Sequence, residues 1–222
     1  MKQKFYDNKK LLLELIPLLL VLCTFIVAWY VYPMLPNKIP SHWNSAGQVD
    51  SYSQKASIFV LPIIFLVVLI LLFVLPILEV FRDNMLKIYT YYYWFKILFG
   101  VFFTVLFIST ILPNFGYNIN VAKIVMLMIG ILFTGLGIIL PKLKRNFIFG
   151  IRTGWTLSND KVWEKTHKVG GILFLILGII TIIISYLLAL EVLFYIFITL
   201  IILISVFLVF YSYYLYRKIV KR

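Results

Sequence analysis

Residues 57–78 read SIFVLPIIFLVVLILLFVLPIL, a run without a single charged side chain. A transmembrane helix needs about 20 consecutive, mainly apolar residues, so this stretch is long enough to cross a bilayer. Five other stretches share its length and apolar character, namely 11–32, 91–112, 121–140, 169–188 and 192–214. The sequence therefore predicts an all-α integral membrane protein with six transmembrane helices, built as a single polytopic unit over residues 1–222.

The composition excludes a soluble globular protein. Of the 222 residues, 63% are hydrophobic and 13% are charged, and the mean hydropathy is +1.03. A soluble domain is about 45–50% apolar and about 25% charged. The net charge of +13 would suggest nucleic-acid binding in a soluble chain. In a membrane protein, Lys and Arg instead set the orientation, so we expect lipid as the surroundings and no direct contact with nucleic acid.

The cations are divided unequally between the two sides of the predicted bundle. Four precede the first span, three lie between residues 82 and 96, seven between 142 and 168, and four follow Tyr216. The opposite side has only Lys38, Lys55 and Lys123. Because cytoplasmic loops are enriched in Lys and Arg, this count predicts that both termini are cytoplasmic.

Three charged residues lie within or directly beside the cytoplasmic ends of the predicted spans: Glu14, Glu79 and Lys96. They could pair with one another, but snorkelling of each side chain to the interface is the simpler interpretation. Because the centres of the spans contain no charged residue, an ion-coupled pump with a midplane carboxylate is not expected.

The outer segment 33–56 is longer than a simple turn requires. Its three prolines and the turn chemistry that follows predict a defined structure. The candidates for binding a ligand outside the membrane are His42, Trp43, Asn44, Gly47 and Asp50. The alternative is a structural cap with Trp43 as an interface anchor. One histidine and one aspartate fall short of the usual ligand set, so we expect neither a metal nor another cofactor.

The inner segment 142–168 reads KLKRNFIFGIRTGWTLSNDKVWEKTHK, with seven cations and two acids. Ser158 as N-cap and Asp160 in the first turn predict a helix from about residue 159 into the fifth span. The aromatic residues before it predict an interfacial or re-entrant loop that tucks Arg152 under the bundle. The candidates for binding a cytoplasmic partner are Gly150, Arg152, Thr153, Trp155, Thr156, Leu157, Trp163 and His167.

Two motifs in these segments resemble known patterns. The outer one, which resembles a small membrane domain often found ahead of SdpI-type immunity modules, consists of Leu35, Pro36, Ile39, Pro40, His42, Trp43, Asn44, Gly47 and Asp50. The inner one, which resembles the signature of the SdpI family, consists of Gly150–Thr153, Trp155–Leu157, Trp163, Lys165–His167 and Gly170–Gly171. Gly154 stands where that family commonly has proline. The resemblance covers roughly residues 33–190.

This resemblance implies a multi-pass protein of the bacterial cell membrane that protects the cell from a secreted toxic peptide. The family also implies a receptor role, in which a cytoplasmic repressor protein is held at the membrane when toxin is present. By analogy, the outer candidates would face the toxin and the inner candidates would face the repressor.

Catalysis is not expected, because the two histidines fall on opposite sides of the membrane. An enzyme would have to build its site from Arg152, Asp160, Glu164 and His167. The sequence is also compatible with a small-molecule or lipid transporter and with a packing subunit of a larger membrane assembly.

Overall fold

The computed structural model describes residues 6–220, so Lys2, Lys4, Lys221 and Arg222 of the cation count lie outside the described residues. Six long apolar helices dominate these residues, each able to cross a membrane by length and composition together with its flanking turns. They are α1 (Asn8–Val31), α2 (Val60–Val74), α4 (Tyr89–Ile111), α5 (Val121–Ile139), α7 (Asp160–Leu187) and α8 (Leu190–Val220). The predicted all-α membrane fold is therefore confirmed.

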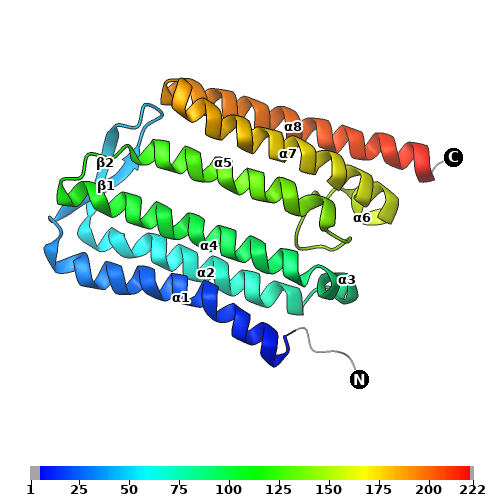
Figure 1. The fold of residues 1–222 in the computed structure, drawn as a ribbon, viewed down its shortest axis with the longest axis horizontal. Coiled ribbons are helices and arrows are strands. Elements are labelled where there is room, and N and C mark those ends of the chain that lie inside the picture. The colour runs from blue at the N-terminus through cyan, green and yellow to red at the C-terminus, as the bar shows by residue number, and fades with distance from the viewer. Residues whose placement is uncertain (1–5, 221–222) are drawn as a thin grey trace.

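The six helices run alongside one another, and the two ends of the bundle differ in what covers them (Figure 1). At one end, called here the hairpin end, lie the strands β1 (Lys38–Trp43) and β2 (Val49–Gln54). At the other, called the loop end, lie the short helices α3 (Arg82–Lys87) and α6 (Gly154–Ser158). Both ends of the chain lie toward the loop end (Figure 1).

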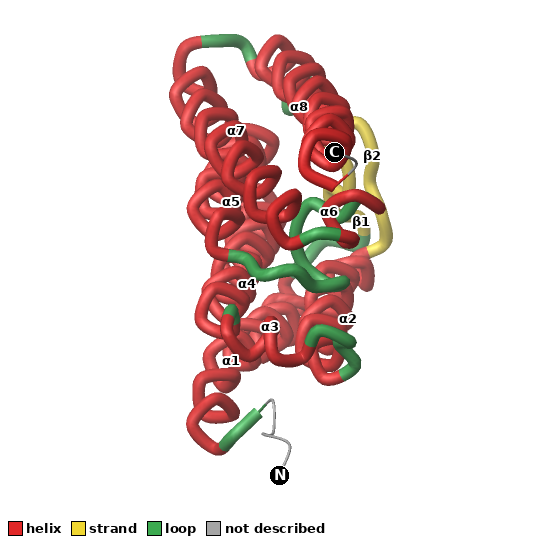
Figure 2. Tube along the Cα trace, turned by 90° about the vertical axis from the view of Figure 1, so that its right-hand side faces the viewer, coloured by secondary structure: helices red, strands yellow, loops and turns green. Residues whose placement is uncertain are grey.

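Seen along the helices, α1, α4, α5 and α7 form a row, and α2 and α8 lie beside its two ends (Figure 2). The most extensive contact is between α5 and α7, where small residues let the backbones approach. A Cβ built on Gly137 would lie 2.4 Å from the Leu175 backbone nitrogen, and one on Gly178 would lie 2.4 Å from that of Thr134. Any larger residue at these two positions would force the helices apart.

The outer segment forms an antiparallel β-hairpin, a defined structure as expected, although strands were not predicted. Asn44 builds its turn, since the side-chain oxygen accepts the backbone N–H groups of Ala46 (3.1 Å) and Gln48 (2.9 Å). Gly47 adopts φ +81°, a conformation that favours glycine. Register shifts on both sides of His42 mark an irregularity in β1.

Glu14 on α1 and Lys96 on α4 form an ion pair inside the bundle, with Lys96 only 1% and Glu14 8% exposed. The Tyr89 hydroxyl also donates to Glu14 (2.9 Å). The snorkelling interpretation is therefore wrong for these two residues, because their side chains pair with each other across the interface between α1 and α4. Glu79, also buried, instead accepts the backbone N–H groups of Phe81 and Phe147.

Candidate functional site

A cavity of about 810 Å³ opens beneath the β-hairpin. Its walls come from β1 and its turn (residues 39–45) and from the hairpin-end portions of α2, α4, α5 and α8. The apolar walls include Ile58, Leu61, Leu106, Val125, Met126 and Ile129. Within the described residues, no Asp, Glu, Lys or Arg lines this cavity. The space therefore suits an apolar guest and offers no charge to pair with a buried ion.

Three of the five outer candidates, His42, Trp43 and Asn44, line this cavity. Gly47 and Asp50 have supporting positions. A Cβ built on Gly47 would lie 2.7 Å from Asn120 Oδ1, so the turn sits close against the start of α5. Asp50 Oδ1 lies 2.5 Å from His42 Nδ1, and both side chains are well exposed, at 43% and 67%. Asp50 therefore orients the imidazole of His42 at the cavity mouth.

At the loop end, residues 143–153, called here the motif loop, are organised around Asn146, which is fully buried. Its side-chain oxygen accepts the N–H groups of Ile148 (2.9 Å) and Phe149 (2.7 Å). Its amide donates to the carbonyls of Lys144 (2.8 Å) and Phe149 (3.1 Å). One side chain thus satisfies four backbone groups that the irregular loop would otherwise leave without partners.

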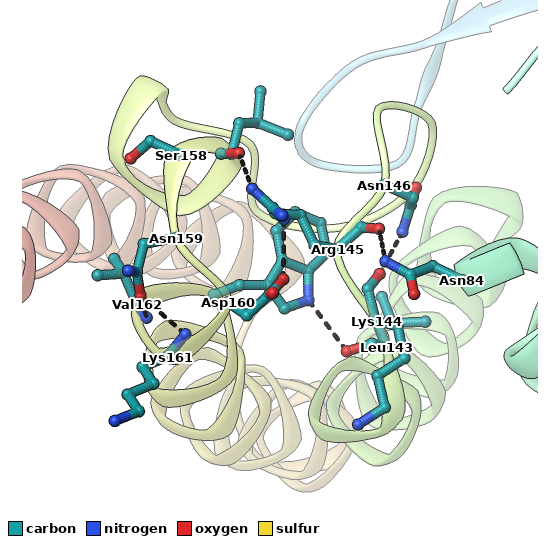
Figure 3. Close-up of polar contacts among 12 residues, drawn as sticks. Asn84, Leu143, Lys144, Arg145, Asn146, Ser158, Asn159, Asp160, Lys161 and Val162 are labelled. Carbon is teal, nitrogen blue, oxygen red and sulfur yellow. Dashed lines mark hydrogen bonds and ion pairs between the residues drawn. The ribbon is translucent and has the colours of Figure 1, made fainter. Parts of the chain in front are cut away.

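Arg145 is the arginine that lies beneath the bundle, and the prediction of this role for Arg152 is wrong. The Arg145 guanidinium donates to the Leu157 carbonyl (2.8 Å) and lies 2.8 Å from the Asp160 carboxylate (Figure 3). It also stacks over the Phe81 ring, 4.7 Å from its centroid. Arg152 is exposed and donates to the Phe147 carbonyl. Arg145, and not Arg152, thus makes the contacts that hold the loop to Leu157, Asp160 and Phe81.

Helix α6 explains why two threonines stand in the inner motif. Thr153 is its N-cap and forms a capping box with Thr156, in which each side chain accepts the other's backbone N–H (3.1 and 2.8 Å). The Thr153 hydroxyl also lies 3.0 Å from that of Ser212 on α8, and the Trp155 ring lies 5.1 Å from that of Tyr213. These contacts fasten the short helix to α8.

Helix α7 begins one residue later than predicted. Asn159, not Ser158, is the N-cap, because its side-chain oxygen accepts the N–H groups of Lys161 (2.9 Å) and Val162 (3.2 Å). Ser158 instead ends α6, and its hydroxyl donates to the Trp155 carbonyl (2.9 Å).

Trp163 and His167 lie one turn apart on α7 and are both buried, with stacked rings 3.9 Å apart. The Trp163 indole donates to the Leu143 carbonyl (3.0 Å; Figure 3), and the Ile151 N–H donates to His167 Nε2 (2.9 Å). Since Nε2 accepts, the proton of His167 sits on Nδ1 and is donated to the Trp163 carbonyl (2.8 Å). His167 is thus a neutral structural residue.

Gly150 makes this arrangement possible. Its φ is +128°, and a Cβ there would lie 2.4 Å from His167 Nε2. Of the eight inner candidates, all within the described residues, only Arg152 is exposed. The inner motif therefore mainly builds the loop itself, and little of it is offered to a partner.

The motif loop also contacts the connection after α2, the short helix α3 and the long helix α4. Glu79, in the connection after α2, accepts the Phe147 N–H (3.0 Å), and the Asn84 amide of α3 donates to the Arg145 carbonyl (2.8 Å; Figure 3). The Phe149 ring packs 4.5 Å from that of Phe95 on α4. Sequence reasoning missed Asn84, Arg145 and Asn146, although the polar run Lys144–Asn146 beside aromatic residues was visible.

Comparison with known proteins agrees with the family resemblance. Residues 142–212 match the SdpI/YfhL protein family, and residues 19–66 match a domain of unknown function, DUF1648. The immunity protein SdpI of Bacillus subtilis strain 168 is 25% identical over 173 residues, which are 78% of this chain and 81% of that protein. No solved structure matches the chain significantly. The resemblance seen in the sequence is thus confirmed, and the chain is a multi-pass bacterial membrane protein that is similar to the SdpI/YfhL protein family over residues 142–212.

Proposed function

We propose that this protein is a membrane immunity protein that protects its cell from a secreted toxic peptide. The observation that carries the proposal is the similarity to an immunity protein along most of both chains. A cavity bordered by the outer motif residues His42, Trp43 and Asn44 supports recognition at the hairpin end. Protection then depends on binding and not on catalysis.

In this proposal the hairpin end faces outward and the loop end faces the cytoplasm. The support is the distribution of cations, since, among the described residues, the hairpin end has only Lys38, Lys55 and Lys123. A cysteine introduced at Tyr52, which is exposed on β2, should react with a membrane-impermeant maleimide in intact cells once Cys23 is replaced. A cysteine at the exposed position Lys165 should react only after the cells are opened. The reverse pattern would overturn the orientation.

Survival of a toxin-sensitive bacterium that expresses the chain tests the function. We expect protection against at least one peptide from a panel of membrane-active peptides that includes those secreted by the chain's own host. His42→Ala should reduce it, because the residue borders the cavity, whereas Tyr52→Ala, on the same hairpin but away from the cavity, should not. If the intact chain, at verified membrane abundance, protects against none of these peptides, the immunity proposal fails.

We further propose that the loop end binds a cytoplasmic repressor protein, as the family resemblance implies. Arg152 is exposed there, as are Lys161, Lys165 and Lys168 at the start of α7. These side chains give the partner a cationic surface, with Arg152 as the one exposed residue among the eight inner candidates. Co-purification of a host repressor with the intact chain, and its loss with Arg152→Ala, is the expected result. Equal recovery of the repressor with the intact chain and with Arg152→Ala would show that Arg152 does not contribute to this binding.

A further inference from the structure

The cavity beneath the hairpin opens toward lipid as well as toward the hairpin. Val60 on α2 and Phe194 and Tyr195 on α8 line it, and all three are exposed large hydrophobic residues at the start of membrane-spanning helices. An apolar side chain that is both exposed and within a span contacts lipid. A guest can therefore reach the cavity sideways, between α2 and α8, without passing through water.

The depth of the cavity matches the hydrocarbon layer of one leaflet. Along α5 its lining residues extend from Val121 to Ile129, which is roughly 12 Å at 1.5 Å per residue. Half of the hydrocarbon core of a bilayer is about 15 Å thick. The cavity thus covers the depth at which the chain of an outer-leaflet molecule lies.

The volume of the cavity suits a slender guest. The cavity holds about 810 Å³. A single hydrocarbon chain is much thinner than a helix and fits this space along the direction of the bundle.

The polar groups at the mouth specify the head group. They are the hydroxyls of Ser41, Ser45 and Ser53, the Asn44 amide and the Trp43 indole, with His42 held by Asp50. The serine hydroxyls, the amide and the indole are neutral, and none of the described lining residues is Asp, Glu, Lys or Arg. A charged head group would lose its hydration there without gaining an opposite full charge, whereas a hydroxylated head group would gain hydrogen bonds.

We propose that this cavity binds the single hydrocarbon chain of an amphiphile with a neutral, hydrogen-bonding head group, which enters sideways from the lipid. The proposed immunity function uses the rim residues His42, Trp43 and Asn44, whereas this proposal concerns the interior of the cavity, so either proposal can fail while the other holds. Trp43, at the mouth, marks the boundary between chain and head group.

Native mass spectrometry of the full chain tests the site, with monoolein, a monoacylglycerol that has one oleoyl chain, as the probe. We expect one bound monoolein to be retained after the detergent is removed. Ala122→Trp places an indole in the cavity and should lower the occupancy by about tenfold, because the chain and the indole compete for the same space. Val67→Trp, on an exposed part of α2 outside the cavity, is the matched control and should bind as the parent does.

If Ala122→Trp fails to fold, as judged by its helical circular dichroism, Val125→Phe one turn deeper on the same lining applies the test with a smaller change. Retention of monoolein by a folded cavity variant at the parental level would overturn the proposal, as would an equal loss with Val67→Trp.

Oleate and oleylamine carry the same chain with a negative and a positive head group, and both should bind more weakly. Equal occupancy by all three would overturn the head-group assignment. A co-purified peptide that monoolein does not displace and that Ala122→Trp removes would assign the cavity to a peptide instead.

Discussion

Asn44 at the hairpin end and Asn146 at the loop end both organise a turn through their side chains, but they differ in what surrounds them. Asn44 accepts two backbone N–H groups and borders an open cavity. Asn146 is fully buried and makes four hydrogen bonds to the backbone. The same residue type therefore leaves polar groups available for a ligand at one end and uses all of them internally at the other. A dense sequence motif does not by itself distinguish a binding site from a structural one.

The largest effect is expected at Gly150. Gly150→Ala should lower the free energy of unfolding by about 3 kcal/mol, because the residue adopts φ +128° and the new Cβ would collide with His167. Unfolding in mixed micelles with increasing SDS measures it. Gly154→Ala, at the first residue of α6, is the control, since nothing lies within 4 Å of its Cβ position. Equal losses at both glycines would show that the motif loop is not tightly built.

The two asparagines test the comparison directly. Asn146→Ala should cost about 2–3 kcal/mol, because it leaves buried backbone groups without partners. Asn44→Ala should cost about 1 kcal/mol or less, since water can replace its bonds at the exposed turn. The same unfolding assay compares the two variants. A larger loss of stability from Asn44→Ala than from Asn146→Ala would mean that the hairpin turn, and not the motif loop, depends more on its asparagine.

Gly154 offers a stabilising change. It is the first residue of α6, after the N-cap Thr153, a position where proline is favoured because the N–H has no partner within the helix. Gly154→Pro should raise the free energy of unfolding by about 0.4–1 kcal/mol by restricting the unfolded chain. The melting temperature in detergent should rise accordingly, whereas Gly47→Pro at φ +81° should lower it. A drop with Gly154→Pro would contradict the observed start of α6.

The smallest effect on stability is expected for Arg152. Arg152→Ala should change the free energy of unfolding by no more than about 0.5 kcal/mol, because the side chain is exposed. Arg145→Ala is the informative counterpart, since this guanidinium contacts Leu157, Asp160 and Phe81 and should lower the stability several times more. Similar unfolding curves for the two variants would mean that Arg145 does not support the loop.

The sequence predicted the membrane fold because the number of long apolar runs determines how many helices can cross a bilayer. It did not predict the strands, since KIPSHW and VDSYSQ lack the alternation of apolar and polar residues that indicates a half-buried strand. The pairing of Glu14 with Lys96 and the role of Arg145 depend on contacts between segments far apart in the chain. Spacing along the chain does not report such contacts, so it could not show which residues of the motif loop support the loop itself.

Survival per folded copy, measured for Trp43→Ala beside Asn146→Ala, tests the difference between the two ends most directly. Trp43 borders the cavity, so its variant should reach the membrane at the parental level and yet protect poorly. Asn146 supports the loop, so its variant should lose protection only in proportion to its lost abundance. A Trp43→Ala protein that protects fully, beside an abundant Asn146→Ala protein that does not, would contradict the account.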